Sequence, residues 1–336
     1  MKALTLIKTG ELAMLDAEKP VPGRGELLVK TKAATICTSD LADIKGSPFG
    51  LKLPQILGHE GAGVVEAVGE GVTEYKPGDE VAVHPVMHCG QCASCRRGLQ
   101  HLCDNMEHLG YSRGGVFAEY FTIRQDKVRM KPAAMSFAVA TLMEPVCDCI
   151  EALERANVKE NSNMLIVGDG PFGILTALIA KIYKPARIIL SGRHEYRLSF
   201  ARGALAINER LVPDAADAIL AAAGGEGIDS AIVCVASAEA ANTAIRVLRS
   251  RGTLALFAAL SGMTPIDLFK VHIKELSICG SCNDMDYLDK AMQLLSDPSL
   301  DLGGVITHQF PFDKWRDAFE QAENGKETGL KATMLL

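Results

Sequence analysis

Four cysteines lie in a run whose spacing is typical of a metal site. They follow the pattern C-x2-C-x2-C-x7-C and are Cys89, Cys92, Cys95 and Cys103. Four thiolates can surround a Zn²⁺ ion as a closed tetrahedron that leaves no position for water, and such sites are structural. Three cysteines separated by two-residue gaps cannot all pair locally, so structural or redox cysteines without a metal are the weaker interpretation. The run therefore predicts one structural zinc.

A second set of possible ligands is spread along the chain. Cys37 and His59 would supply one sulfur and one imidazole nitrogen, a mixture that Zn²⁺ accepts, and Glu60 and Glu144 could add carboxylate oxygen directly or through water. A catalytic zinc keeps one position open for water or an alcohol, whose pKa it lowers. Ser39, two residues after the cysteine, is placed to take the alcohol proton. Each residue alone has an ordinary structural explanation, but together they favour a catalytic metal site.

A glycine-rich turn indicates a dinucleotide site. Gly168, Gly170, Pro171, Phe172 and Gly173 belong to a G-x-G-x-x-G pattern that follows a predicted strand, 164–167, and opens a predicted helix, 174–183. That context gives the pattern its meaning, because the glycines let the backbone approach a pyrophosphate at the helix N-terminus.

The next predicted strand bears on the choice of cofactor. An acidic residue at its end would bind the ribose 2′-hydroxyl of NAD, but the strand ends in Ser191, Gly192 and Arg193. With no carboxylate at the strand end to repel a 2′-phosphate, and with Arg193 and Arg197 nearby to hold one, NADP is favoured over NAD. The alternative is that both arginines are solvated residues at a helix start.

Length and composition restrict the class of protein. The 336 residues suffice for two domains, and 48% hydrophobic with 23% charged residues is a globular balance. A net charge of −6 gives no basic footprint for nucleic acid or an anionic membrane. Neither a signal peptide nor an apolar run long enough to span a bilayer is evident. We expect a cytoplasmic protein.

The pattern of elements changes near residue 150. Before it, short strands separated by Pro and Gly turns are predicted at 1–7, 26–33, 63–68, 80–83 and 117–123. After it, apolar runs suited to parallel strands alternate with helices. These strands are predicted at 164–167, 187–190, 228–235 and 253–259, and the helices at 174–183, 197–206, 215–223 and 239–248. A helix at 285–295, a strand near Ile306, a helix at 314–322 and a final strand follow.

These motifs together resemble the zinc-containing medium-chain alcohol/polyol dehydrogenase superfamily over essentially the whole chain. The resemblance also uses Gly114-Gly115-Val116-Phe117-Ala118-Glu119-Tyr120 and Ile306-Thr307-His308-Gln309-Phe310-Pro311. It implies an α/β protein in which a GroES-like β-rich catalytic domain, 1–148 and 285–336, encloses a Rossmann domain with a doubly wound parallel sheet, 149–284. Substrate would lie in the cleft between them, and members are typically homodimers or homotetramers.

Glu144-Pro145 resembles the sorbitol (polyol) dehydrogenase branch in particular. That match implies Cys37, His59 and one of Glu60 or Glu144 as zinc ligands, with the other carboxylate close by. The chain departs from the family pattern in three places: Ala42 replaces a histidine of the proton relay, Asp43 replaces an aromatic substrate contact, and 146–151 carries Cys147, Asp148, Cys149 and Glu151 where small and apolar residues are usual.

We therefore expect a zinc-dependent NADP(H) oxidoreductase that acts on a secondary alcohol or its ketone, with a polyol or sugar derivative as substrate. One alternative is a simple alcohol or amino-alcohol (threonine-type) dehydrogenase of the same superfamily that uses NAD. A remote alternative is a catalytically silent structural or redox-responsive member, which a second C-x-x-C at Cys279 and Cys282 would suit.

Overall fold

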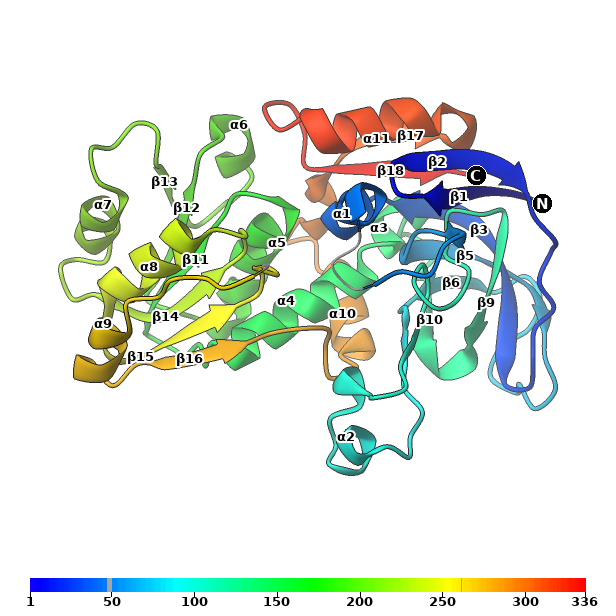
Figure 1. The fold of residues 1–336 in the computed structure, drawn as a ribbon, viewed down its shortest axis with the longest axis horizontal. Coiled ribbons are helices and arrows are strands. Elements are labelled where there is room, and N and C mark those ends of the chain that lie inside the picture. Colours follow the sequence, from blue (N-terminus) through cyan, green and yellow to red (C-terminus); the bar gives the residue numbers. More distant parts are fainter. Residues whose placement is uncertain (47–49, 261) are drawn as a thin grey trace.

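The computed structural model describes residues 1–46, 50–260 and 262–336, and its architecture is built on two large sheets (Figure 1). A parallel sheet with its helices occupies one half of the molecule. An antiparallel-rich sheet occupies the other half, where both chain termini lie. Helix α4 (Met143–Arg155) runs between the halves.

The antiparallel-rich half combines the beginning and the end of the chain. Its seven-stranded sheet has the order β10-β6-β5-β3-β18-β17, with β9 paired to β3. The strands are β3 (Glu26–Thr35), β5 (Glu60–Val68), β6 (Glu80–Val83), β9 (Tyr120–Arg124), β10 (Val128–Met130), β17 (Ile306–Pro311) and β18 (Lys331–Leu335). The register places Thr35 of β3 opposite both Glu60 of β5 and Thr333 of β18. The C-terminal strand is therefore an interior strand of a sheet begun some 300 residues earlier.

Smaller elements complete this half. They are the strands β1 (Lys2–Lys8), β2 (Glu11–Asp16), β4 (Gln55–Ile56), β7 (Val86–Met87) and β8 (Glu107–His108), and the helices α1 (Thr38–Gly46), α2 (Ala93–Arg96), α3 (Phe137–Ala140), α10 (Leu288–Leu295) and α11 (Trp315–Asn324). The lobe that contains α2 projects from the body of the molecule (Figure 1).

The parallel sheet has six strands in the order β13-β12-β11-β14-β15-β16, which is the doubly wound order of dinucleotide-binding folds. Its first strand, Asn163–Val167, is buried at every position, as expected for a strand covered on both faces. The strands are β11 (Asn163–Val167), β12 (Arg187–Gly192), β13 (Leu205–Asn208), β14 (Ile228–Val233), β15 (Leu248–Leu256) and β16 (Ser277–Gly280). The helices are α5 (Pro171–Ala180), α6 (Glu195–Leu198), α7 (Ala215–Ala222), α8 (Ala238–Val247) and α9 (Leu268–Ile273).

Most predicted elements are confirmed to within a few residues, including all the strands of the first half and the glycine-turn helix. The predicted helix 197–206 is wrong. Helix α6 ends at Leu198, and Leu205–Asn208 is strand β13, which pairs in parallel with β12. Gly203, which lies between α6 and β13, has a φ of +86°, a left-handed conformation that a continuous helix over 197–206 could not contain. The prediction did not include several elements of the structure, among them β2, α1, β10, α4, α9 and β16.

Charged contacts tie the segment after β16 to the antiparallel half. Nε2 of His84 lies 2.6 Å from Oδ2 of Asp284, with both side chains buried. Lys127 pairs with Asp286, and Arg129 pairs with Asp289 at 2.5 Å. Burial raises the pKa of Asp284, but His84 outweighs it and holds the pKa below its usual value.

None of the helices in residues 1–46, 50–260 and 262–336 has the length and apolar character of a membrane-spanning helix.

We expect Asp284→Asn to lower the free energy of unfolding by about 1–3 kcal/mol, because it weakens a buried charge-assisted contact. Asp289→Asn is the matched control: its side chain is 74% exposed, and such a surface pair contributes about 0–1 kcal/mol. Since the pKa of Asp284 is lowered, its contribution is present above the ordinary value of about 3.9 and is lost as the pH falls through the lowered value. Urea unfolding at pH 7 and in acid measures this, and equal stability of wild type and variant at pH 7 would contradict it.

Candidate active site and metal centres

One large cavity lies where the two halves meet. Its volume is about 1730 Å³, whereas pockets for small-molecule ligands typically measure ~300–1,000 Å³. The antiparallel half contributes Cys37, Ser39 and His59, and helix α4 contributes Glu144. The C-terminal ends of the parallel strands line the other side, which is where open α/β sheets bind ligands. The cavity has room for a cofactor and a substrate together.

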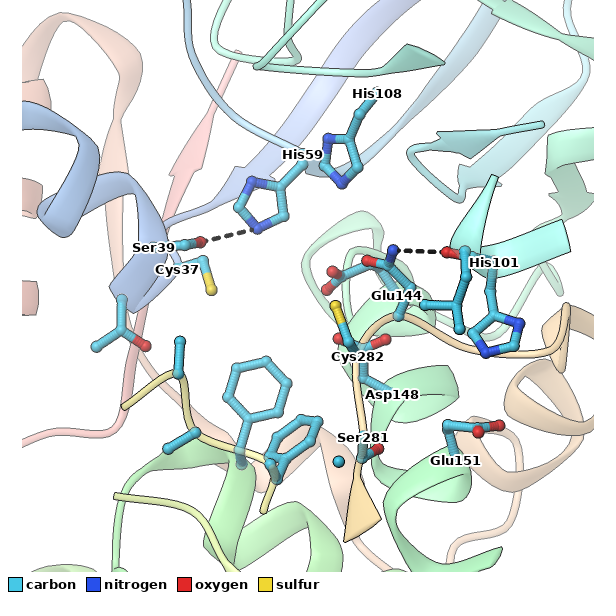
Figure 2. Close-up of a pocket in the computed structure, with 18 of the residues that line it drawn as sticks. Cys37, Ser39, His59, His101, His108, Glu144, Asp148, Glu151, Ser281 and Cys282 are labelled. Carbon is cyan, nitrogen blue, oxygen red and sulfur yellow. Dashed lines mark hydrogen bonds between the residues drawn. The ribbon is translucent and has the colours of Figure 1, made fainter. Parts of the chain in front are cut away.

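Cys37 and His59 come together as predicted, although 22 positions separate them in the sequence. They lie on one side of the cavity with Ser39, facing Glu144 across it (Figure 2). Nε2 of His59 is 3.4 Å from Oγ of Ser39. Cys37, His59 and Glu60 form a group whose possible ligand atoms all lie within 4.8 Å of one another. A thiol, an imidazole and a carboxylate in one buried group suit zinc.

Asp40 contacts both the backbone of Cys37 and the ring of His59. Its Oδ2 accepts a hydrogen bond of 2.8 Å from the backbone N–H of Cys37, and its Oδ1 lies 3.5 Å from Nδ1 of His59. Burial lowers the pKa of His59, but Asp40 and Cys37 more than reverse this, so the pKa is raised well above its usual value. A carboxylate behind the ring is the arrangement that fixes the orientation of a metal-ligating histidine.

Glu60 is already engaged by Lys331. Its two oxygens lie 2.6 and 2.7 Å from the ammonium nitrogen of Lys331, and both side chains are almost fully buried. Burial lowers the pKa of Lys331, but the Glu60 carboxylate outweighs it and the pKa is raised. Glu60 is thus compensated without a metal.

Glu144 has the opposite environment. Its side chain is 7% exposed, and its Oε2 has no hydrogen-bond partner among the described residues. Burial, with the repulsion of Asp148 added, raises its pKa well above the usual range. A buried carboxyl without a partner that faces a cavity is the feature that a bound cation would satisfy.

Sequence reasoning missed Lys331, Asp40 and His108. A lysine in the apolar final strand was the available signal for Lys331, because a lysine is almost never fully buried unless it is paired. The ring of His108 lies 5.7 Å from that of His59, and burial lowers its pKa to about 3, so it remains neutral.

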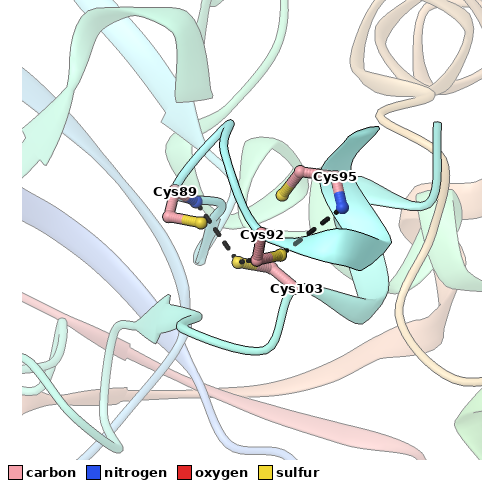
Figure 3. A group of neighbouring side chains, drawn as sticks. All are labelled: Cys89, Cys92, Cys95 and Cys103. Atoms are coloured by element: carbon pink, nitrogen blue, oxygen red, sulfur yellow. Dashed lines mark hydrogen bonds between the residues drawn. The ribbon is translucent and has the colours of Figure 1, made fainter. Parts of the chain in front are cut away.

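The four-cysteine lobe is assembled as predicted. The sulfurs of Cys89, Cys92, Cys95 and Cys103 lie within 4.8 Å of one another (Figure 3). Backbone N–H groups point at the sulfurs: those of Cys95 and Asp104 lie 3.4 Å from Sγ of Cys92, and that of Cys89 lies 3.3 Å from Sγ of Cys103. The backbone N–H of Gln91 is the largest of the contacts that lower the pKa of Cys89 to about 6. These contacts favour the thiolate form of Cys89 and Cys92, the form that binds zinc, whereas burial raises the pKa of Cys95 to about 12.

The glycine turn has the close packing that its pattern requires. Gly168 has a φ of +120°, and a Cβ on Gly173 would lie 1.8 Å from the carbonyl oxygen of Gly168. Helix α5 begins directly after it, with Gly170 as N-cap and Pro171 as its first residue. Phe172 lines the cavity. This half can therefore present a helix N-terminus to a pyrophosphate.

Carboxylates surround the end of β12, although the strand itself ends without one. Asp169 accepts hydrogen bonds of 2.6 Å from the backbone N–H groups of both Arg193 and His194. Arg193 is 56% exposed and donates from Nε to Glu209 at 3.0 Å, and Glu209 also accepts from Ser191 at 2.9 Å. A Cβ on Gly192 would lie 2.5 Å from that of Asp169, so no side chain fits there. The strand end carries no carboxylate of its own, as the sequence shows, but Asp169 and Glu209 reach this position from other segments.

Arg197, predicted together with Arg193 to hold a 2′-phosphate, is buried and not the solvated residue of the alternative interpretation. It is 8% exposed, and its Nε donates to the carbonyl oxygen of Gly329 at 2.8 Å. It therefore joins α6 to the turn before β18.

Two family descriptions match the chain. "Alcohol dehydrogenase GroES-like domain" matches residues 23–133, and "Zinc-binding dehydrogenase" matches residues 171–297. The chain is 30% identical to an L-threonine 3-dehydrogenase of Bacillus subtilis, covering 97% of this chain and 96% of the relative. It is 31% identical to a sorbitol dehydrogenase of the same organism, covering 98% and 96%.

Solved structures agree with these matches. A short chain alcohol dehydrogenase from Escherichia coli complexed with NADH superposes with a TM-score of 0.93 at 28% identity, covering 100% of this chain and 99% of that one. A zinc-binding dehydrogenase from Sinorhizobium meliloti bound to NADP has a TM-score of 0.91 at 26% identity, with coverage of 100% and 99%.

The two ligand groups predict about two zinc ions per subunit, which metal analysis of the purified protein measures. Cys92→Ala is expected to lose one of them and to lower Tm by more than about 4 °C, because a structural zinc contributes folding energy and each ~1 kcal/mol shifts Tm by about 2–4 °C. Cys279→Ala, a cysteine outside both groups, is the control and should retain both ions. A folded wild type without zinc would contradict the prediction.

Proposed function

The chain belongs to the zinc-containing medium-chain alcohol/polyol dehydrogenase superfamily of oxidoreductases, and we propose that it transfers hydride between NADP(H) and a secondary alcohol or its ketone. The substrate class we propose is a polyol or sugar derivative. One observation carries this proposal: the Cys37–Ser39–His59 group, Glu144 and Phe172 of the dinucleotide turn all line the same cavity.

The metal ligands we propose are Cys37, His59 and Glu144. The unpartnered oxygen of Glu144 supports its place in this set, because Glu60 is already paired with Lys331. Glu60 and Lys331 would then form a neutral pair beside the site. When bound, zinc polarises the substrate oxygen and the nicotinamide exchanges hydride with the same carbon.

Residues of the chain would accept the alcohol proton and pass it to solvent. Oγ of Ser39, beside His59 at the cavity wall, would accept the alcohol proton. Asp40 would hold the ring of His59 and the backbone of Cys37 in place. Ala42 is exposed and carries no group that could pass the proton on, so we propose that solvent takes it directly.

The NADP preference we propose depends on Arg193. Its guanidinium is 56% exposed at the end of β12 and can turn towards a 2′-phosphate. If the Arg193 guanidinium turns away, the two carboxylates nearby keep other hydrogen-bond donors. Asp169 accepts two backbone N–H groups, and Glu209 accepts from the hydroxyl of Ser191. The contact between Arg193 and Glu209 favours the second candidate, an NAD enzyme in which Glu209 binds the ribose hydroxyls.

We expect His59→Ala to abolish turnover while the affinity for cofactor, measured by fluorescence titration, stays near that of wild type, because the dinucleotide turn lies on another domain. Ser39→Ala should reduce kcat by about 10²–10⁴-fold, the range of a lost acid–base group. If Ser39→Ala keeps the wild-type kcat, the proton leaves by another route.

Arg193→Ala should reduce kcat/KM for NADP by roughly ten- to a hundred-fold and leave that for NAD nearly unchanged, since a charge-assisted bond to phosphate contributes about 1.5–3 kcal/mol. Arg202→Ala removes one exposed, paired arginine charge elsewhere on this domain and is the control. The second candidate would be established if the wild type has a higher kcat/KM for NAD than for NADP and Glu209→Gln lowers kcat/KM for NAD.

A further inference from the structure

A second histidine lies beside His59 in the wall of the cavity. The ring centroid of His108 is 5.7 Å from that of His59, and both side chains line the cavity (Figure 2). Tyr111 also lines the cavity and packs edge-on against His108, with 4.9 Å between the ring centroids. His108 is therefore within reach of a substrate whose reacting oxygen is held at His59.

The backbone holds His108 in this place. The N–H of His108, at the end of strand β8, donates to Oγ of Ser112 at 2.8 Å. Gly110, two residues further on, has a φ of +81°, and a Cβ there would lie 2.9 Å from the carbonyl oxygen of Gly58. Only a glycine allows this approach, so the turn packs directly against the residue that precedes His59.

The hydrogen bonds of His108 decide which of its ring nitrogens carries the proton. Nδ1 lies 2.6 Å from the carbonyl oxygen of Leu109, and because a carbonyl only accepts, Nδ1 must be the protonated nitrogen. Burial keeps the ring neutral, so Nε2 carries a lone pair and no proton. Among the described residues, Nε2 has no hydrogen-bond partner. An acceptor that loses water without gaining a donor costs free energy, and a donor on the substrate would satisfy it.

The carboxylates of the cavity are less well placed for this contact. The acidic face of helix α4 lines the cavity but leads away from Cys37 and His59 (Figure 2). It consists of four residues spaced three or four apart, Glu144, Asp148, Glu151 and Glu154. Beyond Glu144, a proposed metal ligand, these carboxylates face the distant end of a substrate. A hydroxyl near the reacting carbon is left to His108.

We propose that Nε2 of His108 accepts a hydrogen bond from a second hydroxyl of the substrate, on the carbon next to the carbinol, and so selects a polyol over a simple alcohol. This rests on the proposed dehydrogenase function and assigns a specificity-determining residue to it. The reaction is unchanged: the carbinol C–H bond breaks and its electron pair passes to the nicotinamide, the carbinol proton leaves, and the second hydroxyl keeps its proton.

The test compares kcat/KM for 1,2-propanediol and for 2-butanol, in which a methyl group replaces the second hydroxyl, with zinc-loaded enzyme and saturating cofactor. The wild type should favour the diol by about tenfold or more, because the simple alcohol leaves Nε2 unpaired. His108→Phe keeps an aromatic ring against Tyr111 but has no acceptor. It should reduce the ratio at least about tenfold without lowering kcat/KM for 2-butanol, whereas a merely structural loss would lower both values.

Two further variants separate the acceptor from the packing of the ring. His108→Gln can accept through its amide oxygen, so its ratio should exceed that of His108→Phe. His101→Phe is the matched control, because it removes another histidine of the cavity wall, one that lies across the cavity from His59 (Figure 2). Its ratio should equal that of the wild type.

A substrate pair tests the same contact in the wild type, even if His108→Phe does not fold. 1-Methoxy-2-propanol keeps the second oxygen of the diol but has no proton to donate there, so the enzyme should discriminate against it as it does against 2-butanol. Equal kcat/KM for the ether and the diol, or a ratio unaffected by His108→Phe, overturns the role of His108 alone. Failure to oxidise any alcohol with either cofactor would overturn the dehydrogenase function as well.

Discussion

The buried ion pair between Lys331 and Glu60 constrains the whole catalytic half. Removing one partner of such a pair leaves an uncompensated charge in a site of low dielectric constant, which costs several kcal/mol. The pair therefore requires β18, from the end of the chain, to lie beside β3 and near β5, from its beginning. Thr35, between them in the sheet, hydrogen-bonds through its hydroxyl to Thr141 at 2.5 Å and Thr333 at 2.7 Å. His59 and Cys37 lie next to these strands, so the same packing that neutralises Glu60 positions them.

One face of helix α4 packs into the core and the other lines the cavity. Its buried apolar residues, including Val146, Ile150 and Leu153, pack into the core shared with α5 and α10. Its acidic face borders the cavity, with Glu144 in the first turn, where the helix dipole favours a negative charge. The amphipathic pattern of one helix therefore decides both how the halves meet and which charges face the substrate.

Charge compensation also governs the cofactor end. Asp169 closes the space next to Gly192 and accepts the N–H groups of the following turn, so that the acidic residue typical of the strand end has no room. Arg193 and Glu209 face each other at the surface instead. Under the proposed NADP preference, a 2′-phosphate would compete with the carboxylate of Glu209 for the guanidinium of Arg193.

Much of the site could be predicted from the sequence because its signals are local. The spacing of Cys89, Cys92, Cys95 and Cys103, and the glycines between β11 and α5, encode geometry within a few residues, and the family resemblance indicated Cys37 and His59 with one of Glu60 or Glu144. The strand patterns identified both sheets for the same reason. The partners of these groups come from long range. Lys331 lies 271 residues from Glu60, Asp284 lies 200 residues from His84, and Glu209 reaches Arg193 from the residue that follows β13. A residue's type sets the charge it can carry, but only the packed fold decides which of these groups are buried together. The tertiary structure alone therefore decided that Glu60 is paired with Lys331, while Oε2 of Glu144 is buried with no hydrogen-bond partner among the described residues.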